Sequence, residues 1–149
     1  MRTTFRNLFV LGGCVTIGSF AGESALLKVV VEEPNRSSCQ VYVAVYRDPG
    51  SWLSEKPFRF ENQRMKLGFG TVIVKDLPPG KYAILAYCDF NGNGRLDESS
   101  DGVPQEPYGF SKGGPGSYEM SFSSAAFPVT SKREASGPGE VQKILLLRP

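Results

Sequence analysis

Residues 69–88 read Phe-Gly-Thr-Val-Ile-Val-Lys-Asp-Leu-Pro-Pro-Gly-Lys-Tyr-Ala-Ile-Leu-Ala-Tyr-Cys. Two mainly apolar runs of strand length, 69–75 and 82–88, flank the segment 76–80. In that segment the prolines fix φ and the glycine accepts a strained backbone conformation, as tight turns require. β-Branched and aromatic residues recur in both runs, which is typical of strands. This stretch therefore predicts two strands joined by a turn.

Further strands are expected on both sides of this stretch. Residues 26–31 form an apolar run of strand length. Along 39–46, a cysteine and three valines alternate with other side chains, which is the two-residue period of a strand. Residues 127–130 and 141–147 are also of strand length. No segment of 22–149 shows a sustained 3.6-residue period, so helices should be few and short. We predict an all-β fold, an antiparallel β-sandwich of about six to eight strands whose connections cross between the sheets.

Three segments, 47–64, 89–123 and 131–139, are expected to be irregular. Loops longer than about 15 residues are uncommon in compact domains and are usually functional or mobile. The middle segment is acidic at its start and is the best candidate for a site. The last has the composition of a flexible hairpin tip.

The first 21 residues have the pattern of a secretory signal peptide. Arg2 and Arg6 give a positive start, 8–20 is an apolar run, and Ser19 and Ala21 supply small residues at the −3 and −1 positions of a cleavage site. A membrane anchor is disfavoured because the run is too short to span about 30 Å of hydrocarbon. Lipidation of Cys14 is a weaker alternative. We expect residues 22–149 to be one domain, periplasmic or extracellular.

The net positive charge of the chain comes from this leader. The sequence has 17 basic and 15 acidic residues, and removal of Arg2 and Arg6 leaves 22–149 formally neutral. Nucleic-acid binding needs a basic footprint, so we expect no nucleic-acid partner. No second hydrophobic span follows the leader. The mature chain is expected to be a monomer without a transmembrane span.

Two cysteines, Cys39 and Cys88, remain after cleavage. Each lies at one end of a predicted strand, so antiparallel pairing of those strands would bring them together. Export would place them where disulfides persist. Two cysteines give no spacing pattern to test, and both side chains would also fit a core as free thiols. The sequence leaves the two alternatives open.

Residues 89–101, Asp-Phe-Asn-Gly-Asn-Gly-Arg-Leu-Asp-Glu-Ser-Ser-Asp, resemble a Ca²⁺-binding loop. Alternating Asp and Asn on a turning backbone supply the oxygens that a hard cation needs. The expected ligands are Asp89, Asn91, Asn93, the backbone carbonyl of Arg95, Asp97 and Asp101. Ser100 stands where an EF-hand has a bidentate glutamate, so the affinity should be weak, about 10⁻⁴ to 10⁻³ M. Glu98 and Glu106 are candidate extra ligands, and a metal-free turn is the alternative.

The segments 77–84, 89–97 and 102–111 together resemble a bacterial exported family, domain of unknown function 2141. The resemblance extends over most of 26–147. It implies a small periplasmic or secreted β-sandwich of immunoglobulin or transthyretin (prealbumin)-like type, with no established activity. Members commonly carry a histidine immediately before the first loop aspartate. Here that position is Cys88, so any role of that imidazole is lost.

The chain contains no histidine. Ser-His-Asp and Cys-His catalysis are therefore excluded, and a zinc-hydrolase site is disfavoured. We expect no catalytic residues and a non-enzymatic domain that binds a protein or glycan at the cell envelope. The alternative is a Ca²⁺-dependent hydrolase of extracellular polymer that uses Asp97, Asp101 or Glu106 as acid and base. In that case Glu106→Gln should abolish turnover and leave folding almost unchanged.

Aromatic residues gather after the acidic loop. They are Tyr108, Phe110, Tyr118, Phe122 and Phe127. We expect them to cover the open end of the sandwich, since aromatic side chains bury large areas, and a stacking platform for a ligand is the alternative. Trp52, the only tryptophan, is expected to be either an exposed contact residue or a lid over the core.

Overall fold

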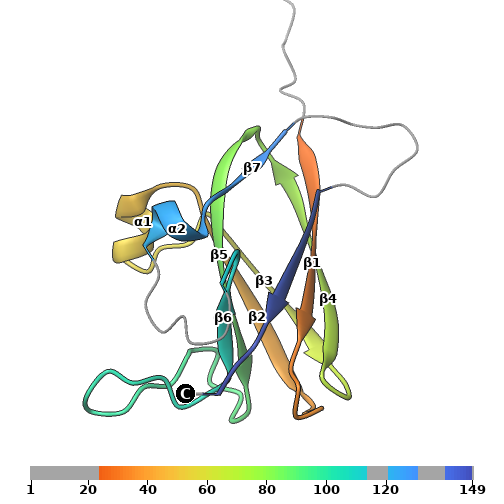
Figure 1. Ribbon diagram of the computed structural model, residues 1–149, viewed down its shortest axis with the longest axis vertical. Coiled ribbons are helices and arrows are strands. Elements are labelled where there is room, and N and C mark those ends of the chain that lie inside the picture. The colour runs from red at the N-terminus through yellow and green to blue at the C-terminus, as the bar shows by residue number, and fades with distance from the viewer. Residues whose placement is uncertain (1–23, 114–120, 131–139, 149) are drawn as a thin grey trace, which may run out of the picture.

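The computed structural model of the protein describes residues 24–113, 121–130 and 140–148. Within these ranges, eight strands form two sheets that pack against each other (Figure 1). The three-stranded sheet has the order β4 (Phe69–Leu77), β1 (Ala25–Glu32), β8 (Glu140–Leu145). The five-stranded sheet has the order β3 (Arg59–Met65), β2 (Cys39–Tyr46), β5 (Gly80–Asp89), β6 (Tyr108–Phe110), and β7 (Phe127–Val129) also pairs with β5. The described part of the chain also contains two short helices, α1 (Pro49–Leu53) and α2 (Phe122–Ala125).

The core follows from the alternation of side chains along the strands. On β2, Val41, Val43 and Val45 are fully buried and point between the sheets, where they meet side chains such as Leu27 and Val29 of β1. Each buried aliphatic side chain of this size contributes about 1.5–3 kcal/mol. The predicted β-sandwich and its strand count are confirmed. The opposite side chains of β2 and β5 point away from the core and are available to build a site.

The prediction that 47–64 is irregular is wrong for the end of that segment, because the strand β3 begins at Arg59. β3 is an edge strand whose sequence, Arg-Phe-Glu-Asn-Gln-Arg-Met, buries only Met65. A strand with so little apolar alternation gives no pattern to detect. The segment 89–123 likewise contains the three-residue strand β6, which is too short to recognise, and the helix α2 begins near its end.

The strand directions also differ in part from the prediction. β1 pairs with β4 in antiparallel fashion but with β8 in parallel fashion, from Leu27 opposite Glu140 to Glu32 opposite Leu145. The first sheet is therefore mixed. The turn at 76–80 joins β4 and β5, which belong to different sheets, so it is a crossing between the two layers.

A disulfide joins Cys39 and Cys88, whose Cα atoms lie 5.7 Å apart. It links neighbouring strands β2 and β5 and lies within the core. Of the two alternatives left open by the sequence, the structure has the bridge. Because Asp89 follows Cys88 directly, the disulfide also fixes the point at which the acidic loop leaves β5.

The Gly-Phe-Ser segment 109–111 has a structural role. A Cβ atom on Gly109 would lie 2.3 Å from the backbone oxygen of Leu145, so only glycine allows β8 to approach so closely. The buried Ser111 hydroxyl accepts a hydrogen bond from the Ile84 N–H (2.8 Å) and donates one to the Ala125 oxygen (2.8 Å). The segment thereby connects β5 with α2 and β8.

Candidate functional site

The outer face of the five-stranded sheet carries one apolar row that crosses four strands. The register places Phe60 of β3 opposite Ala44 of β2, Ala44 opposite Leu85 of β5, and Leu85 opposite Phe110 of β6. With strands about 4.8 Å apart, the two phenylalanines at the ends of the row are about 14 Å apart along the sheet. The row forms the floor of a cleft with a volume of about 760 Å³.

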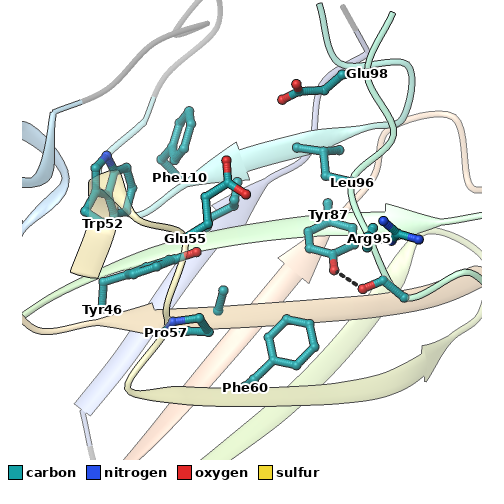
Figure 2. Close-up of a pocket in the computed structure, with 13 residues that line it drawn as sticks. Tyr46, Trp52, Glu55, Pro57, Phe60, Tyr87, Arg95, Leu96, Glu98 and Phe110 are labelled. Carbon is teal, nitrogen blue, oxygen red and sulfur yellow. Dashed lines mark hydrogen bonds between the residues drawn. The ribbon is translucent and has the colours of Figure 1, made fainter. Parts of the chain in front are cut away.

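One wall of this cleft is the segment 49–57 (Figure 2). It begins with α1, whose N-cap Asp48 accepts the Ser51 N–H at 2.8 Å and whose first turn contains a proline. The helix presents Trp52, whose ring centroid lies 5.0 Å from that of Tyr46 and 5.6 Å from that of Phe110. Glu55 follows on the same wall.

The opposite wall is the acidic loop, through the segment 94–98. Arg95, Leu96 and Glu98 line the cleft there (Figure 2). The loop is fastened to the floor by the Tyr87 hydroxyl, which donates a hydrogen bond to the Gly94 oxygen at 2.8 Å. Burial raises the pKa of Tyr87 well above its ordinary value, and the neighbouring Tyr42 and the charge of Asp89 raise it further. Tyr87 therefore stays a hydrogen-bond donor over the whole physiological pH range.

The aromatic rings of the cleft differ in exposure. Phe60 is 46% exposed, and Trp52 and Phe110 are half-buried. Tyr46 and Tyr87 are almost completely buried beneath them. We call this site, with Trp52, Phe60 and Phe110 as its accessible rings, the aromatic cleft. Its volume lies within the range typical of small-molecule pockets, about 300–1,000 Å³.

The acidic loop is organised by the buried carboxylate of Asp89. One oxygen accepts the Gly92 N–H at 2.6 Å and the other accepts the Gly94 N–H at 2.8 Å. Gly92 has a φ of 78° and Gly94 a φ of 75°, and this left-handed conformation favours glycine. Asp89 is thus the centre of a tight turn, and both of its oxygens already have partners.

Asn91, Asn93 and Asp97 converge at the tip of the loop. Their contacts are hydrogen bonds to one another: the Nδ2 atoms of Asn91 and Asn93 donate to the two Asp97 oxygens at 2.5 and 2.7 Å. Each asparagine Oδ1 accepts the N–H two residues further on, at Asn93 and Arg95. These are the local bonds of Asx turns. The amide nitrogens face Asp97, so a cation there requires both amides to rotate.

Asp101, another expected ligand, lies apart from these residues. Asp101 is exposed in a separate turn, in which the Gly102 N–H donates to the Ser99 oxygen. The Arg95 side chain lines the aromatic cleft, while its backbone carbonyl, which is the expected ligand, stays a prediction. Within 24–113, 121–130 and 140–148, no group of three or more histidine, cysteine, aspartate or glutamate residues is placed to hold a metal ion.

Glu106 is buried, and its carboxylate holds the two ends of the loop together. Oε1 accepts the Phe90 N–H at 2.9 Å, and Oε2 accepts the Asp97 N–H at 3.3 Å. The sequence-based expectation that Glu106→Gln leaves folding almost unchanged does not fit this arrangement. A buried carboxylate that satisfies two backbone donors contributes to stability, because an amide can accept from only one of them.

The aromatic residues predicted after the loop separate into two groups. Tyr108 and Phe127 are buried, as expected for covering residues, whereas Phe110 and Phe122 lie near Trp52, with the Trp52 and Phe122 ring centroids 6.5 Å apart. Tyr118 lies outside the described residues. Trp52 is a wall of the cleft on the outer face of the sheet and does not cover the core.

Sequence reasoning missed Tyr46, Glu55, Phe60 and Leu85 as site residues. The available signal was the alternation of 39–46, which places Tyr42, Ala44 and Tyr46 on the face opposite the buried valines. Aromatic side chains on the outward face of a strand often belong to a binding surface. Phe60 gave no signal, because its strand was not recognised.

Fold and site together define a small β-sandwich with an aromatic cleft on the outer face of one sheet. The chain belongs to a family described as uncharacterized protein conserved in bacteria, DUF2141, whose model matches residues 29–136. The predicted family is therefore confirmed. No curated protein and no solved structure gave a significant match to the chain.

Proposed function

We propose that the protein is an exported, non-enzymatic domain that binds a protein or glycan of the bacterial cell envelope in the aromatic cleft. The observation that carries this proposal is the cleft itself. Accessible rings of Trp52, Phe60 and Phe110 surround a floor of small and aliphatic side chains, with charged groups at the rim. Apolar concave sites with a few polar groups are the usual form of ligand sites in proteins.

Export is supported by the disulfide between Cys39 and Cys88, since such bonds persist in oxidising compartments. The signal peptide and its cleavage site lie outside the described residues. In the part of the chain that is described, no helix is long and apolar enough to cross a membrane. Expression in a bacterium should yield a mature protein that begins at Gly22, which mass spectrometry measures directly.

Weak Ca²⁺ binding at the acidic loop is a further part of the proposal. The oxygens of Asn91, Asn93 and Asp97 would hold the ion after the two amides turn inward, at the expense of their bonds to Asp97. Calorimetric titration of chelator-treated protein tests this, with Asp97→Asn as the variant because it leaves the Asp89 turn intact. Saturable binding by the parent in the millimolar range and none by Asp97→Asn is expected. Absence of binding by the parent would make the loop a metal-free turn.

A non-enzymatic role agrees with how two of the three candidate carboxylates, Asp97 and Glu106, are used. Both oxygens of Glu106 accept backbone N–H groups, and both oxygens of Asp97 accept side-chain amides. A general acid or base needs a carboxyl group within reach of substrate and free to exchange a proton. No observation favours the hydrolase alternative with these residues.

The binding proposal can be tested through the intrinsic fluorescence of Trp52, because it is the only tryptophan in the chain. Soluble peptidoglycan fragments and other envelope oligosaccharides and peptides are added to residues 22–149. Binding in the cleft should change the emission. Phe60→Ala should weaken binding about tenfold, as for aromatic residues at the centre of binding sites.

The matched control is Phe69→Ala. Phe69 is 55% exposed, similar to Phe60, but it lies on β4 in the other sheet. Its substitution should leave affinity unchanged. If no envelope component changes the emission, or if the two variants behave alike, the aromatic cleft is not the binding site.

A further inference from the structure

We infer that the ligand of the aromatic cleft is an oligosaccharide that carries amino groups, whose ring faces pack on the aromatic side chains while its ammonium groups meet Glu55 and Glu98. This inference rests on the proposed binding function and names the class of ligand. Three independent features of the cleft lead to it: the backbone conformation of Glu55, the charges of the two walls, and the nature of the floor.

Glu55 adopts a left-handed backbone conformation with φ of 53°. It follows α1, where the Lys56 N–H donates to the Ser51 oxygen (3.0 Å) and the Glu55 N–H donates to the Trp52 oxygen (3.4 Å). This pair of bonds is the Schellman motif, and its left-handed position is usually glycine because a Cβ is unfavourable there. The fold therefore holds a glutamate side chain where glycine would be more stable. At this position the glutamate side chain lines the aromatic cleft, which a glycine would leave without a carboxylate.

The two walls carry more negative than positive charge. Glu55 projects from the helix wall and Glu98 lies on the loop wall, while Arg95 is the one basic side chain among the residues that line the cleft (Figure 2). The Glu55 side chain lies near the aromatic side chains of Trp52, Tyr46 and Phe110 (Figure 2). Burial raises the pKa of Tyr46, and the charge of Glu55 raises it further. Cations bind favourably beside aromatic faces, and anionic ligands are disfavoured by the excess of carboxylates.

The floor of the cleft favours a ligand recognised by its rings. It is the face of a sheet in which β2 pairs with β3 and β5, and β5 pairs with β2 and β6. The main-chain groups of β2 are thus used within the sheet, so an extended peptide cannot add as a further strand there. Phe60 and Phe110, about 14 Å apart from the strand spacing, instead offer two apolar surfaces to non-adjacent rings of a short sugar polymer.

The test compares β-1,4-linked trimers of glucosamine, glucose and glucuronic acid, which present cationic, neutral and anionic groups on similar rings. Binding to residues 22–149 is followed by Trp52 fluorescence at a pH that keeps the amines protonated. The glucosamine trimer should bind about tenfold more tightly than the glucose trimer, with an advantage that decreases as salt is added. The glucuronic acid trimer should bind most weakly. Equal affinities, or tightest binding of the anionic trimer, would overturn the inference.

Variants of Glu55 separate a binding role from a structural one. Glu55→Gln should remove most of the preference for the glucosamine trimer. Glu55→Gly should remove it as well, while the melting temperature is retained or raised. If Glu55→Gly lowers the melting temperature and the preference survives, the carboxylate has no part in binding.

A peptide arm distinguishes failure of this inference from failure of the proposed function. The peptide contains lysine and tyrosine and matches the charge of the glucosamine trimer. Tighter binding of the peptide than of the trimer would overturn the sugar assignment and leave the aromatic cleft as a binding site. If neither the sugars, the peptide nor the envelope components change Trp52 emission, both proposals fail.

Discussion

Replacement of Glu106 by glutamine should destabilise the protein measurably, although the side chain keeps its size. The carboxylate accepts the Phe90 N–H at 2.9 Å and the Asp97 N–H at 3.3 Å, and it is 5% exposed. Glutamine has one oxygen, so one backbone N–H would face the NH₂ group and lose its acceptor. A hydrogen bond to a charged group contributes about 1.5–3 kcal/mol, and the longer of the two bonds belongs at the lower end, so we expect a loss of about 2 kcal/mol.

The measurement is urea unfolding of residues 22–149, with the midpoint and the slope compared between parent and variant. Glu98→Gln is the control, because Glu98 lies in the same loop and is exposed, and its substitution should change stability by less than about 0.5 kcal/mol. Amide exchange at Phe90 and Asp97 should accelerate in Glu106→Gln only. Equal stability of the two variants would refute the assignment of Glu106 as the residue that closes the loop.

Other predictions concern buried residues that stabilise the fold around the site. Ser111→Ala should cost about 2–4 kcal/mol in urea unfolding, because a buried donor and a buried acceptor each lose their partner, whereas Ser123→Ala on the exposed side of α2 should cost little. A Cys39→Ala/Cys88→Ala variant, with a sequence separation of 49, should lose roughly 4 kcal/mol by the chain-entropy estimate; an unchanged melting temperature would contradict a stabilising bridge. Acid should destabilise the protein through Glu33: burial tends to raise its pKa, but N–H groups that donate to the carboxylate lower it overall. Because the pKa of Glu33 is lower in the folded state, its contribution to stability is present above the pKa of about 4.3 in the unfolded state and is lost as the pH falls through the pKa in the folded state. The higher melting temperature of the parent relative to Glu33→Gln should therefore vanish between about pH 5 and pH 2. An advantage that is independent of pH would be inconsistent with this sign.

The fold was predictable where the burial of one face of a strand requires apolar residues at alternate positions. The valines of 39–46 alternate because one face of β2 meets the core, and the prolines and glycine of 76–80 mark a turn. β3 escaped notice because an edge strand that buries only Met65 needs no apolar alternation. The parallel pairing of β1 and β8 could not be inferred, because strand direction depends on a connection between distant parts of the chain.

The site was predictable only in part, for a related reason. The acidic loop is a contiguous turn, so its Asx chemistry was visible from residues 89–97 alone. The aromatic cleft is assembled across four strands, and only the register brings Phe60 and Phe110 to the two ends of one row. Long-range register is not encoded in any local window. The burial of Glu106, which makes it a structural residue, was hidden for the same reason.

The most direct test of the central claim is chemical-shift mapping on isotope-labelled residues 22–149 titrated separately with the glucosamine trimer and with soluble peptidoglycan fragments, which contain both sugar and peptide. Shift changes should concentrate on the floor and walls of the aromatic cleft, at Ala44, Trp52, Leu85 and the segment 94–98. The outer face of the other sheet, around Ile73, should be unaffected. Saturable changes confined to that other face, or no changes at all, would contradict the assignment of the aromatic cleft as the binding site.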